Sequence, residues 1–129
     1  MNGLTEAQWQ ALQARLERAR KDLLSQLADD LDRSADVRVP LPHEAEASPA
    51  DNASQRTLNA LVLETAAHTS HQLGAVRRAL ARMDEHNYGL CENCDEEIGF
   101  SRLDARPEAR FCIACQTRLE RPRRHGASP

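Results

Sequence analysis

The sequence predicts a mainly α-helical protein: a long antiparallel coiled-coil hairpin with a small four-cysteine zinc finger at its base and a short C-terminal helix. Three observations predict this class. Two long stretches with helical apolar periodicity flank a proline-bearing segment, the cysteines form two C-x-x-C pairs, and aromatic residues make up only 3% of the chain. A chain of 129 residues with so few aromatic side chains cannot fill a large globular core, so narrow apolar stripes on long helices are expected.

The first helix is expected from residue 5 to about residue 36. Thr5 and Gln8 have the spacing of a capping box at its start. Leucines then recur at intervals that keep one stripe in register, namely Leu12, Leu16, Leu23, Leu27 and Leu31. No proline or glycine interrupts the run, so the helix is expected to continue without a break.

A proline-bearing connector separates the two helices. Pro40 and Pro42 lack amide donors and push the residues before them toward extended conformations, so a tip loop is expected near residues 37–53. The second helix is expected from Ser48, a favoured N-cap residue, to about Met83. Its predicted heptad seam has a polar middle and comprises Leu58, Val62, Thr65, Thr69, Gln72, Val76, Ala79 and Met83. The predicted stripe is widened by Leu61, Leu63, Leu73 and Leu80.

The matched lengths of the helices favour an intramolecular antiparallel hairpin, about 45–50 Å long at a rise of about 1.5 Å per residue. The alternative is that each helix pairs with another chain, in which case the polar seam residues would specify that pairing. We predict the hairpin for residues 1–85, a zinc-finger module with a short helix for 86–119, and a basic flexible tail for 120–129.

The only cysteines of the chain form two pairs, Cys91 with Cys94 and Cys112 with Cys115, separated by 17 residues (95–111). This spacing is typical of a four-thiolate zinc site. Four protein ligands close the coordination sphere, so we expect one structural zinc ion with no open position for water or substrate. Iron in a four-thiolate site and a redox-sensitive thiol switch are the alternatives.

Bulk composition disfavours several other classes of function. The net charge of −3 argues against a general nucleic-acid binder. No apolar run approaches the length of a membrane span and the N-terminus lacks a secretory signal, so a cytoplasmic protein without a membrane partner is expected. A thiol redox enzyme is disfavoured because both cysteine pairs serve one site and no βαβ pattern surrounds them.

The stretch 88–115, YGLCENCDEEIGFSRLDARPEARFCIAC, closely resembles the zinc finger of the DksA/TraR family. The matching motifs are Y-G-x-C-x-x-C, E-I-G, R-L-x-A-R-P and C-I-x-C. Upstream, residues 51–55 (DNASQ) resemble the coiled-coil tip motif of the family, so the resemblance covers about residues 48–119.

The resemblance implies a non-enzymatic transcription regulator that binds bacterial RNA polymerase. Members of the family insert the coiled-coil prong into the secondary channel, so that the tip approaches the active centre. They modulate initiation, often together with guanosine tetraphosphate, and bind no specific DNA sequence. This hypothesis predicts an elongated monomer. The competing hypothesis is a dimeric zinc-ribbon coiled-coil module that binds another protein or a nucleic acid.

The resemblance places the tip at Ser48, Asp51 and Ala53. In the family pattern D-x-x-D-x-A, Asp51 keeps the second acid and Ala53 keeps the alanine, while Ser48 replaces the first acid. Asp51 also has a purely structural alternative role, because an acid in the first turn of a helix stabilises the exposed amides by about 0.3–1 kcal/mol.

The resemblance also implies where the alarmone and the polymerase rim are contacted. The lysines that contact the alarmone in the best-studied members correspond to Ala75 and Gln116, while Arg106 is retained. The basic position that touches the polymerase rim appears as His68. Because loss of two cations weakens binding of a highly anionic ligand, we expect weakened or absent dependence on guanosine tetraphosphate.

Overall fold

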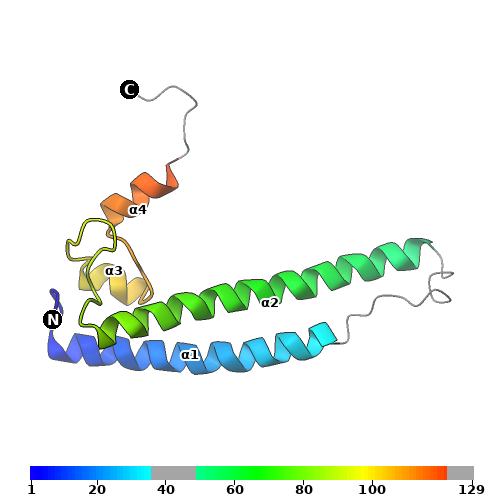
Figure 1. Ribbon diagram of the computed structural model, residues 1–129, viewed down its shortest axis with the longest axis horizontal. Helices are drawn as coiled ribbons and strands as arrows, with labels where there is room; N and C mark the ends of the chain where they lie inside the picture. The colour runs from blue at the N-terminus through cyan, green and yellow to red at the C-terminus, as the bar shows by residue number, and fades with distance from the viewer. Residues whose placement is uncertain (36–48, 122–129) are drawn as a thin grey trace. The chain divides into compact units, whose positions relative to one another are not determined.

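The computed structural model of the chain describes residues 1–35 and 49–121. These residues form four helices, α1 (Glu6–Ala35), α2 (Pro49–Asp84), α3 (Phe100–Ala105) and α4 (Ile113–Glu120) (Figure 1). The β-structure within these ranges is an isolated antiparallel bridge between Leu90 and Glu97. The mainly helical class predicted from the sequence is therefore confirmed. Within the same ranges, no helix is long and apolar enough to cross a membrane.

The start of α1 is fixed by a reciprocal capping box. The backbone N–H of Gln8 donates to the Thr5 hydroxyl (3.1 Å), and the backbone N–H of Thr5 donates to the Gln8 side-chain oxygen (3.0 Å). Two amides at the helix start are thereby satisfied, as the spacing of these residues predicts. The observed bounds of α1 lie within one residue of those expected.

Helix α2 begins with Pro49, a residue favoured at the first helical position because its missing amide would be unpaired there anyway. Residues 49–53, the last part of the expected tip loop, are therefore helical. The expected N-cap residue Ser48 lies outside the described residues. The helix ends at Asp84, and beyond it the backbone amides of Asn87 and Tyr88 both donate to the Arg82 carbonyl (2.8 and 3.1 Å).

The chain forms two compact units, and each of the two long helices is divided between them. Unit 1 contains Met1–Glu17 together with the chain from Val76 onward, and unit 2 contains Arg18–Ala75. In unit 2 the later turns of α1 lie beside α2 in the antiparallel sense. The division into a hairpin, a zinc-finger module and a tail stays a prediction.

The core of unit 1 joins α1, the end of α2 and α3. Its most deeply buried apolar side chains are Leu12, Leu16, Tyr88 and Leu103. The Trp9 and Tyr88 rings pack edge to face, with centroids 5.5 Å apart, and the Tyr88 hydroxyl donates to the Pro107 carbonyl (2.8 Å). Burial raises the pKa of Tyr88, so this phenol stays a hydrogen-bond donor.

The heptad seam predicted for α2 is wrong at three positions. Leu58, Thr65 and Gln72 are exposed. The buried positions on α2 are Ala66, Thr69, Leu73, Val76, Ala79, Leu80 and Met83. The seam runs through Leu73 in place of Gln72, because burying a leucine removes apolar surface from water while burying an amide requires hydrogen-bond partners.

Candidate metal centre

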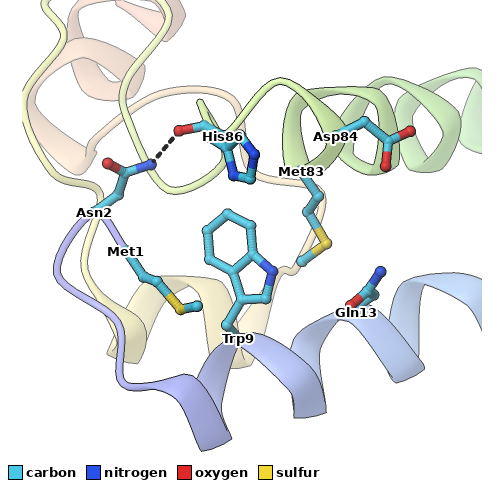
Figure 2. A pocket seen from close by; sticks show the side chains of 7 residues that line it. All are labelled: Met1, Asn2, Trp9, Gln13, Met83, Asp84 and His86. Atoms are coloured by element: carbon cyan, nitrogen blue, oxygen red, sulfur yellow. Dashed lines mark hydrogen bonds between the residues drawn. The ribbon is translucent and has the colours of Figure 1, made fainter.

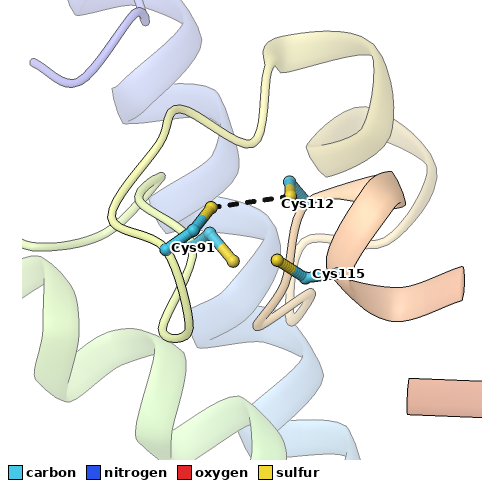
Figure 3. A group of neighbouring side chains, drawn as sticks. Cys91, Cys112 and Cys115 are labelled. Carbon is cyan, nitrogen blue, oxygen red and sulfur yellow. Dashed lines mark hydrogen bonds between the residues drawn. The ribbon is translucent and has the colours of Figure 1, made fainter. Parts of the chain in front are cut away.

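The four cysteine sulfurs come together in unit 1, all within 4.8 Å of one another. The Cys94 and Cys112 sulfurs are 3.8 Å apart. In a tetrahedral site with Zn–S bonds of about 2.3 Å, neighbouring sulfurs are about 3.8 Å apart. Figure 3 shows the Cys91, Cys112 and Cys115 side chains converging on one point. Cys91 comes from the turn at residues 91–96, the first knuckle, while Cys112 and Cys115 come from the start of α4, the second knuckle. The arrangement therefore fits one tetrahedral zinc ion.

The first knuckle is a tight turn closed by its own backbone. The Cys91 N–H donates to the Glu96 carbonyl (2.8 Å), and the Asp95 N–H donates to the Cys91 carbonyl (2.9 Å). Asp95 has a φ of 61°, a left-handed conformation that lets the chain reverse within the knuckle. The Asn93 N–H is directed at the Cys91 sulfur (3.4 Å), where it stabilises a thiolate.

The second knuckle is the start of α4. Cys112 is the N-cap residue of this helix, and Cys115 lies in its first turn. Both sulfurs therefore lie at the positive end of the helix dipole, which attracts negative charge. Cys115 also receives hydrogen bonds from the side chains of Asn93 and Arg118, both 3.3 Å from its sulfur.

The pKa values of Cys91, Cys94 and Cys115 are shifted in different directions. Burial raises the pKa of Cys91, but backbone hydrogen bonds from Cys112 and from the first knuckle outweigh burial and lower this pKa to about 6. The Glu96 amide lowers the pKa of Cys94, whereas burial and the neighbouring thiols raise it, to about 12 in all. The side-chain hydrogen bond from Asn93 lowers the pKa of Cys115 as well, so two thiolates are favoured while the one at Cys94 is opposed. A bound cation is therefore needed to hold all four ligands as thiolates.

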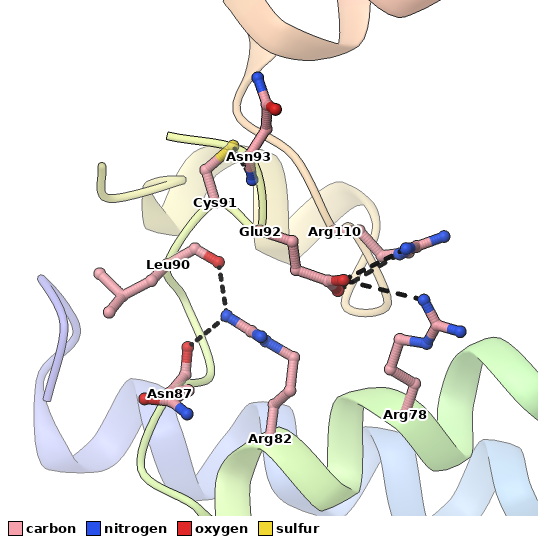
Figure 4. Close-up of polar contacts among 8 residues, drawn as sticks. All are labelled: Arg78, Arg82, Asn87, Leu90, Cys91, Glu92, Asn93 and Arg110. Carbon is pink, nitrogen blue, oxygen red and sulfur yellow. Dashed lines mark hydrogen bonds and ion pairs between the residues drawn. The ribbon is translucent and has the colours of Figure 1, made fainter. Parts of the chain in front are cut away.

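An arginine cluster connects α2 to both knuckles (Figure 4). Glu92 accepts two hydrogen bonds of 3.2 Å from Arg110 and pairs with Arg78 at 3.7 Å. Arg82 donates to the carbonyls of Asn87 and Leu90, both at 3.1 Å. Sequence reasoning missed this cluster, because nothing in the spacing of the residues indicates that they meet.

The other candidate residues are not part of the four-sulfur cluster. Arg106 is exposed and pairs with Glu108 (3.6 Å), and Gln116 follows Cys115 in α4 and donates to Glu120 (2.6 Å). His68 lies on α2 with its side chain exposed. The tip residue Ala53 is exposed in the first turns of α2. Ser48 lies outside the described residues, and so does the side chain of Asp51.

Long helices that pack in the antiparallel sense, followed by a four-thiolate finger, define a helical-hairpin zinc-finger protein. Residues 86–121 match the model of the prokaryotic dksA/traR C4-type zinc finger. The RNA polymerase-binding transcription factor DksA of Caulobacter vibrioides is 36% identical over 111 residues, which are 84% of this chain and 78% of that protein. The protein of the same name from Escherichia coli K12 is 32% identical over 100 residues, or 74% of this chain and 63% of that protein.

The fold is also similar to a solved structure, that of transcription factor DksA2 from Pseudomonas aeruginosa. The TM-score is 0.73 at 29% sequence identity, and the match covers 89% of this chain and 84% of that chain. The chain belongs to the DksA/TraR family. Its four clustered cysteines hold one structural zinc ion, as the C4-type finger of the family requires.

Proposed function

We propose that this protein is a transcription regulator that binds bacterial RNA polymerase and inserts the tip of its helical hairpin into the secondary channel. The observation that carries the proposal is the likeness over 84% of the chain to a protein named an RNA polymerase-binding transcription factor. That likeness extends well beyond the finger, so it includes the helices that would enter the channel.

The chemistry of the metal centre supports a binding role rather than catalysis. A zinc ion held by four thiolates has no open position for water or substrate. The ion therefore fixes the two knuckles relative to each other, and the Glu92–Arg110 pair adds a polar contact between them. In this proposal the zinc finger stabilises the base of the helical hairpin, and the hairpin docks on RNA polymerase in the cytoplasm.

The proposed acting end of the molecule is the tip, with Ser48, Asp51 and Ala53. The exposure of Ala53 supports this, because a small exposed residue permits close approach to another surface. Ser48 replaces an acid of the family pattern, so the tip has one carboxylate fewer. We expect the protein to bind polymerase and to act on initiation through Asp51.

The substitution Asp51→Asn tests this role, with Asp22→Asn in α1 as a matched control. The expected result is that Asp51→Asn still binds purified polymerase but no longer changes initiation, while Asp22→Asn behaves as the wild type. If Asp51→Asn only lowers helix stability and keeps the transcriptional effect, Asp51 is a helix-start residue and the proposed tip is wrong.

A dimeric zinc-ribbon module that binds another protein or a nucleic acid is the second candidate. The observation that favours it is a group of leucines in unit 2 that are more than half exposed: Leu31, Leu58, Leu61 and Leu63. Such side chains could pair with a second copy of the chain. Sedimentation equilibrium separates the candidates, since a monomer supports the polymerase regulator and a stable dimer supports the module.

A further inference from the structure

Two side chains outside the ligand set donate to one sulfur of the metal centre, that of Cys115. The Asn93 amide nitrogen and an Arg118 guanidinium nitrogen each lie 3.3 Å from this sulfur. Cys115 is only 1% exposed, whereas Cys94 is exposed to solvent. Because water hardly reaches Cys115, these two donors stabilise negative charge on its sulfur in place of solvent.

The two donors come from opposite knuckles. Asn93 lies in the first knuckle, where its backbone N–H is also directed at the Cys91 sulfur at 3.4 Å (Figure 4). Asn93 thus contacts one sulfur from each knuckle. Arg118 lies three residues after Cys115 in α4, a spacing that places both side chains on the same face of the helix. Hydrogen bonds to the Cys115 sulfur therefore connect the knuckles in addition to the bonds that a metal ion makes.

The charge of the site explains why such donors matter. A divalent ion neutralises only two of four thiolates, so a four-thiolate site keeps an excess of negative charge. Where water is excluded, this excess is costly unless donors and cations nearby offset it. Arg118 supplies a permanent positive charge and Asn93 an amide donor. Within residues 1–35 and 49–121, Arg118 makes no ion pair with a carboxylate that would draw its charge away from the sulfur.

We propose that Asn93 and Arg118 are positioning residues of the zinc site, whose hydrogen bonds to the Cys115 sulfur raise the zinc affinity of the finger. Outer partners of metal ligands commonly contribute about 10–100-fold to metal affinity. The alternative is that Asn93 only closes the first knuckle and Arg118 only covers the surface of α4. Hydrogen bonds to the sulfur change its electron density and the alternative does not, so a measurement on the metal–sulfur bond separates the two interpretations.

The first experiment measures the zinc affinity of the full-length protein by competition with a chromogenic chelator. Arg118→Gln removes the guanidinium beside the sulfur. The matched control Arg121→Gln makes the same change three residues further along the chain, at an exposed arginine whose side chain donates to no sulfur. We expect Arg118→Gln to lower the affinity about tenfold, the lower end of the range because this arginine is exposed, and Arg121→Gln to leave it unchanged.

The second experiment replaces zinc by cobalt(II), whose sulfur-to-metal charge-transfer band reports the electron density on the thiolates. Loss of a donor leaves the sulfur richer in electrons, so the band should move to longer wavelength in Arg118→Gln and in Asn93→Leu. Asn2→Leu is the control for the second variant. The Asn2 amide donates to the carbonyls of His86 (2.9 Å) and Tyr88 (2.7 Å), ahead of the first knuckle, and to no sulfur (Figure 2).

Asn2→Leu separates a structural effect from an effect on the sulfur. Asn2 has a φ of 57°, which disfavours leucine, so this variant loosens the chain before the first knuckle while both sulfur donors remain. Its cobalt band should keep the wild-type position. Equal zinc affinities of Arg118→Gln and Arg121→Gln would overturn the proposal. An unshifted band in Arg118→Gln or Asn93→Leu, or an equal shift in Asn2→Leu, would overturn it as well. No polymerase is present in these experiments, so either failure would leave the proposed function intact.

Discussion

The hydroxyl of Thr69 on α2 donates a 2.8 Å hydrogen bond to the Asp30 carboxylate on α1, and both side chains are buried. Gln26 and Arg33 donate to the other oxygen of the same carboxylate, at 3.1 and 2.7 Å. A buried carboxylate is costly unless its oxygens are hydrogen-bonded, and a register that separates Asp30 from Thr69 loses one of these donors. The pair therefore favours one register of the two helices in unit 2.

Replacing Thr69 by valine should destabilise the protein by about 1–3 kcal/mol, because the shape is kept while the Asp30 carboxylate loses a donor. Urea unfolding followed by circular dichroism measures the free energy of unfolding. Thr65→Val is the matched control, since the Thr65 hydroxyl is exposed and donates only to the Leu61 carbonyl of its own helix (2.9 Å). Its effect should stay within about 0.5 kcal/mol. Similar effects of the two changes would contradict the importance of the Asp30–Thr69 pair.

The same carboxylate should make stability depend on pH in the acid range. The hydrogen bond from Thr69 lowers the pKa of Asp30 and outweighs the opposing effect of burial, with help from Gln26 and Arg33. A lowered pKa in the folded state means that the stabilisation is complete above the unfolded value of about 4 and is lost as the pH falls through the folded value.

The measurement is the difference in free energy of unfolding between the wild type and Asp30→Asn, determined from pH 7 down to pH 3. Any loss of zinc in acid affects both proteins, so it cancels from the difference. The wild type should lose its advantage over the variant as the pH falls below about 4. A difference that stays constant over this range would show that the Asp30 pKa is not lowered by folding.

Zinc removal should unfold the finger, because structural zinc contributes about 10–16 kcal/mol in zinc-finger peptides at neutral pH. Metal analysis of the purified protein should give one zinc per chain, and Cys115→Ser should abolish retention. Acidification should release the ion, since protons compete with it for the thiolates. Iron in place of zinc, detected by metal analysis and by visible absorption, would contradict the assignment.

Installing the two missing lysines should create dependence on guanosine tetraphosphate. The double variant Ala75→Lys, Gln116→Lys adds two cations at the proposed alarmone positions, where Arg106 is already present. The matched control is Ser70→Lys, Thr117→Lys, which adds the same charge at exposed positions. Transcription from an alarmone-sensitive promoter should respond to the nucleotide several-fold more with the first variant than with the control or the wild type. Strong dependence of the wild-type protein on the nucleotide would contradict the expectation that Ala75 and Gln116 weaken alarmone binding.

The features that sequence predicted well are those set by neighbouring residues. The Thr5–Gln8 capping box, the bounds of the long helices and the four clustered cysteines each follow from short spacings with one physical meaning. The burial of Asp30 could not be predicted, because an aspartate within a highly charged helix is expected to face solvent unless its partner on the other helix is known. The stripe predicted for α2 contained both Gln72 and Leu73, and the packing of α1 on α2, which no short spacing encodes, decides that Leu73 is buried and Gln72 exposed.

The central proposal is that the tip of the hairpin reaches the active centre of RNA polymerase. The most direct measurement loads purified polymerase with iron in place of its catalytic magnesium and maps where locally generated hydroxyl radicals cut the bound protein. The proposal predicts cleavage near residues 48–53. Binding with cleavage elsewhere, or with none, would show that the protein docks outside the secondary channel and would contradict the proposal.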